Sequence, residues 1–183
     1  MRNTVALVVA TFVLSSACSA QIKTTTTDAA LKEQVFRAPF LLKLRIDDRR
    51  FYEERFDRVP YVAEDDVYLF AGEAFGITLT IVGDRISRVI YQKDMAKADV
   101  ELKFTQEESP SGLLMMLVIR NKLKQRLSYD AVMTVPGKKG VFKTTVLPVE
   151  PDLSNFESWP HPIVQLVLRD FRLSEEGAKQ SER

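Results

Sequence analysis

The stretch that decides the fold is Gly112–Val135, which reads GLLMMLVIRNKLKQRLSYDAVMTV. Its first nine residues, GLLMMLVIR, are apolar on both faces of an extended chain, which is typical of a central strand in a sandwich. The run LSYDAVMTV follows after a short, strongly charged connection. Neither run shows helical periodicity, so the pair predicts two successive strands in an all-β protein.

Alternation of apolar and polar residues with period two continues on both sides of this stretch. Phe40–Ile46 and Phe75–Ile81 each place apolar side chains on one face of an extended segment. The remaining candidate strands are Val67–Phe70, Ile86–Gln92, Val100–Phe104, Gly140–Val149 and Pro162–Leu173. About nine strands, separated by Gly, Pro, Asp and Asn, predict an antiparallel β-sandwich or barrel.

The segment Val118–Met133, VIRNKLKQRLSYDAVM, resembles the middle of immunoglobulin-like and fibronectin-type sandwiches. In those domains an apolar strand ends in Asn, a loop follows, and the next strand carries a Tyr and an Ala. The likeness is architectural and implies an antiparallel immunoglobulin-like β-sandwich, which we place at residues 38–173. A fold of this class does not define a function.

The N-terminus has the pattern of a secretory signal peptide. Arg2 precedes the uncharged run Thr4–Ala17, and small residues crowd together at its end. The run is shorter than the roughly 20 residues that a membrane-spanning helix needs. We therefore predict a signal peptide over residues 1–17 and an exported protein.

The five residues Leu14-Ser15-Ser16-Ala17-Cys18 resemble the lipobox of bacterial lipoprotein precursors. In that class the cysteine is acylated and the chain is cut before it. The stretch departs from the favoured pattern because Ser15 stands where leucine is usual. The resemblance implies lipid attachment at Cys18, and Ser19 implies the periplasmic side of the outer membrane. Ordinary cleavage after Ala20, giving a soluble periplasmic or secreted protein, is the alternative.

The single cysteine and the balanced charge indicate which attachments and partners the chain can have. Cys18 is the only cysteine, so an exported chain has no disulfide to form and this thiol is free for a lipid. Removal of Arg2 leaves 25 basic residues of 26, against 25 acidic ones, and this balance argues against nucleic acid. We predict a lipid-anchored tether over 18–37 and a disordered tail over 174–183.

The sequence offers few groups for catalysis. His161, the only histidine, lies between two prolines in ESWPHPIV. No serine-hydrolase elbow, P-loop or dinucleotide motif occurs, and the chain lacks the Cys and His residues of a zinc site. We therefore predict that the chain is not an enzyme and takes no cofactor or metal.

Carboxylates cluster in three places, at Asp47-Asp48, at Glu53-Glu54 with Asp57, and at Glu64-Asp65-Asp66. Such clusters could bind calcium or hydrolyse glycosidic bonds. Arginines beside the first two and the turn-like character of the third favour solvated, charge-balanced loops instead.

Two features are candidate contacts for a partner or ligand. The first is a basic stripe, in which cations fall at every second position and would point the same way in an extended strand: Arg120, Lys122, Lys124 and Arg126. It could bind an acidic partner, or it could keep an edge strand soluble. The second is Trp159, which could stack on a sugar or anchor a partner together with Phe156, or could plug the core. We expect the proline-bracketed loop over 149–161 to be rigid.

Three functional classes follow from these observations. The first is a cell-envelope lipoprotein that binds or helps to assemble another envelope protein. The second is a periplasmic module that binds a glycan or another small ligand. The third is an enzyme of unknown class, which would need a cleft that gathers His161 with carboxylates.

Overall fold

The computed structural model describes residues 34–110 and 112–174, and this part of the chain is almost entirely β-structure. The strands and one short 3₁₀ helix, η1, follow in the order β1 (Phe40–Arg45), β2 (Phe51–Phe56), β3 (Val62–Ala63), β4 (Asp66–Leu69), β5 (Glu73–Val82), β6 (Arg85–Gln92), η1 (Met95–Lys97), β7 (Val100–Ser109), β8 (Gly112–Asn121), β9 (Arg126–Thr134), β10 (Phe142–Thr144), β11 (Ser154–Trp159) and β12 (Gln165–Ser174). Every pairing between these strands is antiparallel.

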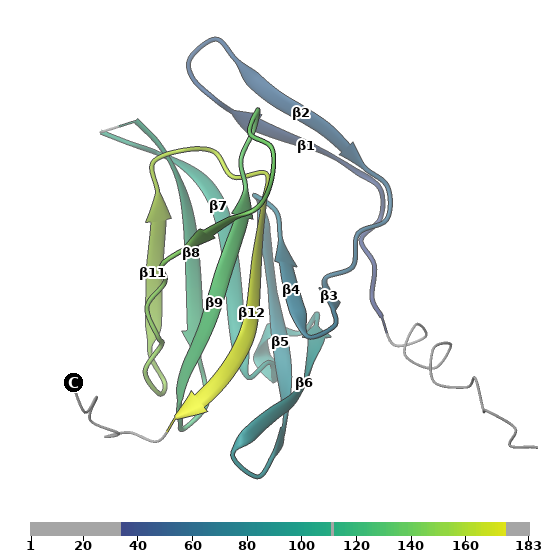
Figure 1. The fold of residues 1–183 in the computed structure, drawn as a ribbon, viewed down its shortest axis with the longest axis vertical. Helices are drawn as coiled ribbons and strands as arrows, with labels where there is room; N and C mark the ends of the chain where they lie inside the picture. Colours follow the sequence, from purple (N-terminus) through teal and green to yellow (C-terminus); the bar gives the residue numbers. More distant parts are fainter. Residues whose placement is uncertain (1–33, 111, 175–183) are drawn as a thin grey trace, which may run out of the picture. The chain divides into compact units, whose positions relative to one another are not determined.

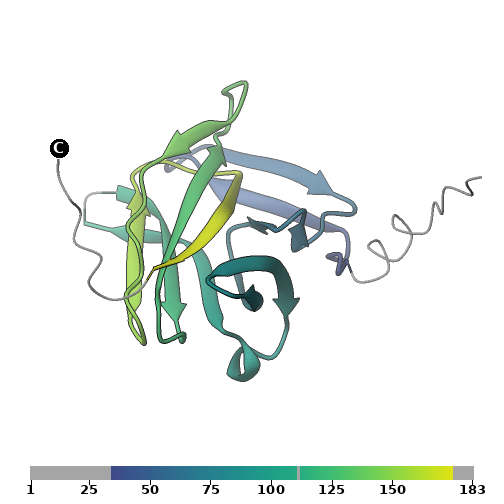
Figure 2. The same ribbon diagram turned by 60° about the horizontal axis from the view of Figure 1, so that its bottom comes forward.

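The strands form two five-stranded sheets and one hairpin. One sheet has the order β10-β9-β12-β4-β3 and the other the order β11-β8-β7-β5-β6, while β1 and β2 pair only with each other. Figure 1 and Figure 2 show the two large sheets as facing layers, with the β1–β2 hairpin at one end of them. The predicted all-β antiparallel sandwich is therefore confirmed, whereas an immunoglobulin-like strand order stays a prediction.

The core lies between the two large sheets and is filled by alternate residues of each strand. On β7 the buried positions are Val100, Leu102 and Phe104, and on β8 they include Leu117 and Ile119. Each large apolar side chain that is removed from water contributes about 1.5–3 kcal/mol. The period-two pattern in the sequence thus marks the inner faces.

The β1–β2 hairpin belongs to this core, although it shares no strand pairing with either large sheet. Leu42 and Leu44 are 4% and 0% exposed. The rings of Phe40 and Phe56 stack with their centroids 5.3 Å apart, and both lie within 5.1 Å of the Phe70 ring. The inner face of the hairpin therefore closes one end of the sandwich.

The last four residues of the predicted tether, Gln34–Arg37, belong to the folded domain. The backbone N–H of Tyr61 donates to the Val35 carbonyl, and that of Arg37 donates to the Val59 carbonyl, both over 3.0 Å. Arg37 is only 6% exposed. The predicted boundary at residue 38 is therefore wrong, because a buried charged residue lies on the tether side of it.

The sequence does not predict three of the strands, β2, the two-residue β3 and β11, and it predicts one strand that is too long. We expected a charged loop at β2 and a rigid loop at β11. The single strand expected over Gly140–Val149 reduces to the three residues of β10 and an isolated bridge between Val149 and Leu127. Three of the six residues of β2 are charged, because most of this strand faces solvent.

The hydrophobic pattern of the sequence does not reveal β11, because polar residues take the positions on the same side as the buried Trp159. Glu157 accepts a hydrogen bond of 2.7 Å from the Leu147 N–H, and the Asn155 amide donates to the Leu147 carbonyl over 3.3 Å. The Trp159 indole N–H donates to the Thr144 hydroxyl over 2.8 Å. The Trp159 bond joins β11 to β10 of the other sheet, whereas Asn155 and Glu157 bond to Leu147 in the segment after β10, so partly buried polar residues alternate with exposed ones on β11.

Candidate functional site

Three connections meet at the end of the sandwich that carries the hairpin, and they enclose a cleft of about 490 Å³. They are the β1–β2 turn, the β7–β8 hairpin and the β11–β12 connection (Figure 1). The lining residues are Arg45, Ile46, Asp47, Asp48, Glu108, Ser109, Gly112, Leu113, Leu114, Pro160, His161 and Pro162. We call this the end cleft.

The β1–β2 turn is shaped by Asp47. Its Oδ1 atom accepts hydrogen bonds from the backbone N–H groups of Arg49 and Arg50, at 3.0 and 2.9 Å. Such an Asp side chain replaces backbone acceptors and fixes a tight turn. These bonds and an ion pair with Arg50 lower the pKa of Asp47, so it stays ionised near neutral pH.

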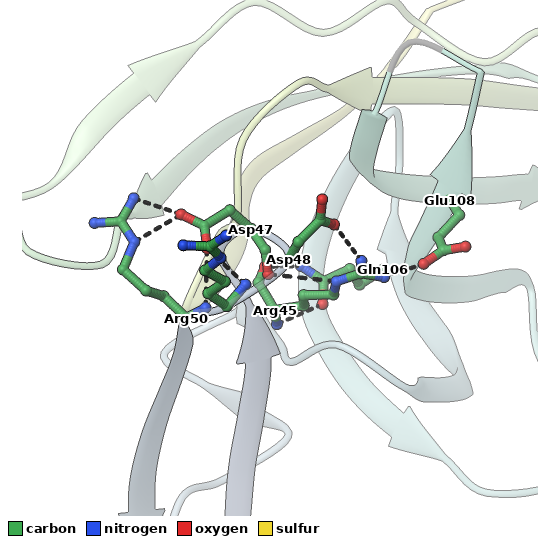
Figure 3. Close-up of polar contacts among 7 residues, drawn as sticks. Arg45, Asp47, Asp48, Arg50, Gln106 and Glu108 are labelled. Atoms are coloured by element: carbon green, nitrogen blue, oxygen red, sulfur yellow. Dashed lines mark hydrogen bonds and ion pairs between the residues drawn. The ribbon is translucent and has the colours of Figure 1, made fainter.

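The hairpin is fastened to the sandwich by the side-chain amide of Gln106 on β7. Its oxygen accepts from the Arg45 backbone N–H, and its NH₂ group donates to the Arg45 carbonyl, both over 2.8 Å (Figure 3). Gln106 therefore acts like one residue of a neighbouring strand. This clamp sets the distance between the β1–β2 turn and β7, and hence the width of the end cleft.

The guanidinium of Arg45 lies between carboxylates from two elements. One terminal nitrogen is 2.5 Å from Asp48 Oδ1, and the other pairs with Glu108 Oε1 (Figure 3). The hydrogen bond to Asp48, followed by the charge of Glu108, raises the pKa of Arg45. The side chains of Asp48 and Glu108 are 92% and 73% exposed, so this is a solvated rim rather than a buried ion pair.

His161 lies in the end cleft together with Asp47, Asp48 and Glu108, which is the gathering that the enzyme hypothesis required. Its Nδ1 atom is 3.3 Å from the Pro162 carbonyl oxygen. Among the described residues, no carboxylate and no hydroxyl group forms a hydrogen bond with the ring. General acid–base chemistry at His161 would need such a bond or a substrate that completes it.

The four cations of the basic stripe do not lie on one extended strand. Arg120 is the next-to-last residue of β8 in one sheet and Arg126 begins β9 in the other, with a bent connection between the two strands. Each cation has an acidic partner within 4.0 Å: Glu101 for Arg120 and Lys122, Asp152 for Lys124, and Glu150 for Arg126. The expected common direction is therefore wrong, because the chain crosses between sheets here.

This crossing is organised by Asn121, which is 0% exposed. Its amide donates to the carbonyls of Gln125 and Val149, at 2.8 and 3.1 Å, and its oxygen accepts from the Leu123 N–H at 2.9 Å. The Asn noted in the sequence is thus a buried corner residue.

Trp159 is 7% exposed and belongs to the core, where its ring meets Phe104 at a centroid distance of 6.4 Å. Phe156, three residues earlier, is 65% exposed. Trp159 is therefore not available for stacking on a sugar, while Phe156 remains accessible on β11.

The carboxylate cluster at Glu64-Asp65-Asp66 shapes a turn and contacts the other sheet. Glu64 and Asp65 form the two-residue turn between β3 and β4, with φ of 52° and 65°. Asp65 also accepts a hydrogen bond of 2.8 Å from the Val89 N–H on the edge strand β6. Within residues 34–110 and 112–174, no group of three His, Cys, Asp or Glu side chains is placed to hold a metal ion.

Sequence reasoning noted Asp47, Asp48 and His161 one by one but did not bring them together. It missed Arg45, Glu108 and the apolar residues of the cleft, because the contact between the β1–β2 turn and β7 joins positions more than 60 residues apart. Cys18, the signal peptide and residues 18–33 of the predicted tether lie outside the described residues, as do residues 175–183.

No protein-family model, curated protein or solved structure matches this chain. In the described part of the chain, no helix has the length and apolar character needed to cross a membrane.

Proposed function

We propose that this chain is a cell-envelope lipoprotein whose β-sandwich binds another envelope protein through the end cleft. The observation that carries the proposal is the meeting of three separate connections around one cleft with a charged rim and apolar lining residues. Connections that cluster at one end of a rigid sandwich are a common place for binding sites.

The proposed anchor rests on the lipobox-like sequence and the single cysteine. If Cys18 is the mature N-terminus, residues 19–33 form the whole link to the folded part, which begins at Gln34 at the latest. Even a fully extended chain of that length would span only about 55 Å, so the partner would lie close to the membrane.

The anchor is tested by the intact mass of the native protein from membrane and soluble fractions, beside a Cys18→Ser variant. We expect an acylated N-terminal cysteine in the membrane fraction and an unprocessed or soluble variant. A soluble mature chain that begins at Gln21 would remove the lipoprotein part of the proposal.

Partner binding is tested by photo-crosslinking in intact cells. A photoreactive residue placed at Leu113, in the wall of the cleft, should yield a discrete adduct. The same residue at Val82, which is 65% exposed at the far tip of the β5–β6 hairpin (Figure 1), should not. Repeated failure to obtain an adduct that depends on position would count against a protein partner.

A small free ligand is the second candidate. A volume of about 490 Å³ falls within the range of roughly 300–1,000 Å³ that small-molecule pockets occupy. Because Trp159 is buried directly before Pro160, a residue of the cleft wall, its fluorescence should respond to a ligand packed there. A spectrum that stays constant across glycans and small amines would remove this candidate.

A further inference from the structure

The end cleft is lined by both apolar residues and charged residues, and a ligand must complement both. Five of the lining residues are apolar: Ile46 from the β1–β2 turn, Leu113 and Leu114 from β8, and Pro160 and Pro162 from the β11–β12 connection. The rim carries three carboxylates, from Asp47, Asp48 and Glu108, against the one cation of Arg45. A complementary group must therefore be apolar along its length and positively charged at its tip.

The molecule itself shows that a guanidinium fits between the two exposed carboxylates. Arg45 reaches Asp48 with one terminal nitrogen and Glu108 with the other. Its side chain remains 32% exposed. Ion pairs in such a setting are weak, since water competes for both partners.

Asp48 and Glu108 also keep acceptor capacity after binding Arg45. Each uses one carboxylate oxygen, Oδ1 in Asp48 and Oε1 in Glu108. The second oxygen of each takes no hydrogen bond from a described residue. Asp47 differs, because Arg49 and Arg50 occupy both of its oxygens.

We propose that the end cleft binds a lysine or arginine side chain presented by the partner protein, with Asp48 and Glu108 as its acceptors. Long basic side chains lay their methylene stems on apolar surface and keep the charged head in a polar setting. The stem would pack on Leu113 and Leu114, and the head would share the carboxylates with Arg45. This inference rests on the proposed partner binding and names its chemistry.

The test is a titration of the purified full-length protein, followed by the NMR signals of Leu113, Leu114 and His161. The probe is the peptide acetyl-Leu-Lys-Leu-amide. The matched control peptide carries norleucine in place of lysine and so keeps the stem without the charge. We expect the lysine peptide to shift these signals, to bind more weakly at high salt, and to bind more tightly than the norleucine peptide.

Two variants locate the contact. Asp48→Asn combined with Glu108→Gln should weaken the lysine peptide by about five- to twentyfold. Asp57→Asn combined with Asp152→Asn removes the same charge from exposed ion pairs outside the cleft and should leave affinity unchanged. Equal binding of the two peptides, or no loss in the first variant, would overturn the proposal.

The outcomes separate this inference from the proposed function. If a protein crosslinks at Leu113 but the two peptides bind equally, the end cleft still binds a partner, but the partner does not present a lysine or arginine side chain to it. Lysine selectivity without a crosslinked protein would keep the chemistry and assign the cleft to a free cationic ligand, which overturns the partner part of the proposal.

Discussion

Arg37 precedes strand β1 and Arg45 is its last residue, and both pair with carboxylates in very different surroundings. The side chain of Arg37 is 3% exposed and that of its partner Glu73 is 19% exposed. For Arg45 and Asp48 the values are 32% and 92%. An arginine–carboxylate pair is thus buried before β1 and solvated at the end of this strand.

The two arginines differ in how many of their guanidinium N–H groups have a hydrogen-bond partner inside the fold. The Arg37 guanidinium donates twice to Glu73 and once each to the carbonyls of Pro60 and Tyr68, and it stacks 4.0 Å above the ring of Tyr61. These four bonds use four of the five guanidinium N–H groups, and a buried charge needs such partners because leaving it unpaired costs several kcal/mol. An exposed pair contributes about 0–1 kcal/mol and can be shared. Arg37 therefore serves the fold, while Arg45 leaves its carboxylates open to a ligand.

The largest effect should come from Arg37→Met. This change leaves Glu73 part-buried without its cation and removes the donors from two backbone carbonyls, so the free energy of unfolding should fall by about 3–5 kcal/mol. Urea unfolding measures it. The control Lys124→Met breaks an ion pair whose cation is 84% exposed and should stay within about 0.5 kcal/mol of the parent. Equal losses in the two variants would remove the distinction between buried and exposed arginines.

Asn121→Ala should have the next largest effect, since it tests a buried polar group without charge. The change strips donors from the carbonyls of Gln125 and Val149 and an acceptor from the Leu123 N–H. We expect a loss of about 2–3 kcal/mol in unfolding free energy. A loss below about 1 kcal/mol would mean that burial of charge, rather than of polarity, sets the cost at Arg37.

The fold was predictable wherever a strand has one apolar and one polar face. Phe75–Ile81 and Val100–Phe104 followed this rule and correspond to β5 and β7. β11 broke it, because Asn155 and Glu157 face inward to bond the backbone of Leu147. No local pattern in the sequence predicts that a polar side chain will bond to the backbone of a neighbouring segment.

The candidate site was less predictable than the fold for a related reason. The basic stripe is regular in sequence, but regular spacing has a common direction only in a continuous strand, and the chain turns at Asn121. The end cleft depends on contacts between segments that are far apart in the sequence. The sequence predicts that carboxylates close to arginines in the chain form ion pairs with them, as Asp47 and Asp57 do. Which arginine contacts which carboxylate follows only from the packing.

Gln106→Met should produce an intermediate effect by releasing the hairpin clamp. The variant loses both hydrogen bonds to the Arg45 backbone, which should lower the free energy of unfolding by about 1–2 kcal/mol. Amide hydrogen exchange should also accelerate at Arg45 more than at Leu117 in the core. Uniform acceleration at both amides would show that the clamp acts on global stability alone.

Arg45→Met should change stability by no more than about 1 kcal/mol, because the pairs that it breaks are solvated. The same variant frees both carboxylates, so the acetyl-Leu-Lys-Leu-amide peptide should bind more tightly than it does to the parent protein. Thermal unfolding and the NMR titration measure the two effects. A large loss of stability would place Arg45 in the same class as Arg37.

The smallest effect is the acid dependence that Asp47 contributes. Its pKa is lowered from its ordinary 3.8 by the N–H of Arg49 and the side chain of Arg50. A carboxyl group whose pKa is lower in the folded state stabilises the protein at every pH above its ordinary pKa. This contribution is lost as the pH falls through the pKa of the folded state. Asp47→Asn should therefore reduce the difference in melting temperature between pH 7 and pH 3. If the variant keeps the full difference, the acid sensitivity lies elsewhere, with Asp130 as the next group, since Arg172 and Lys143 lower its pKa.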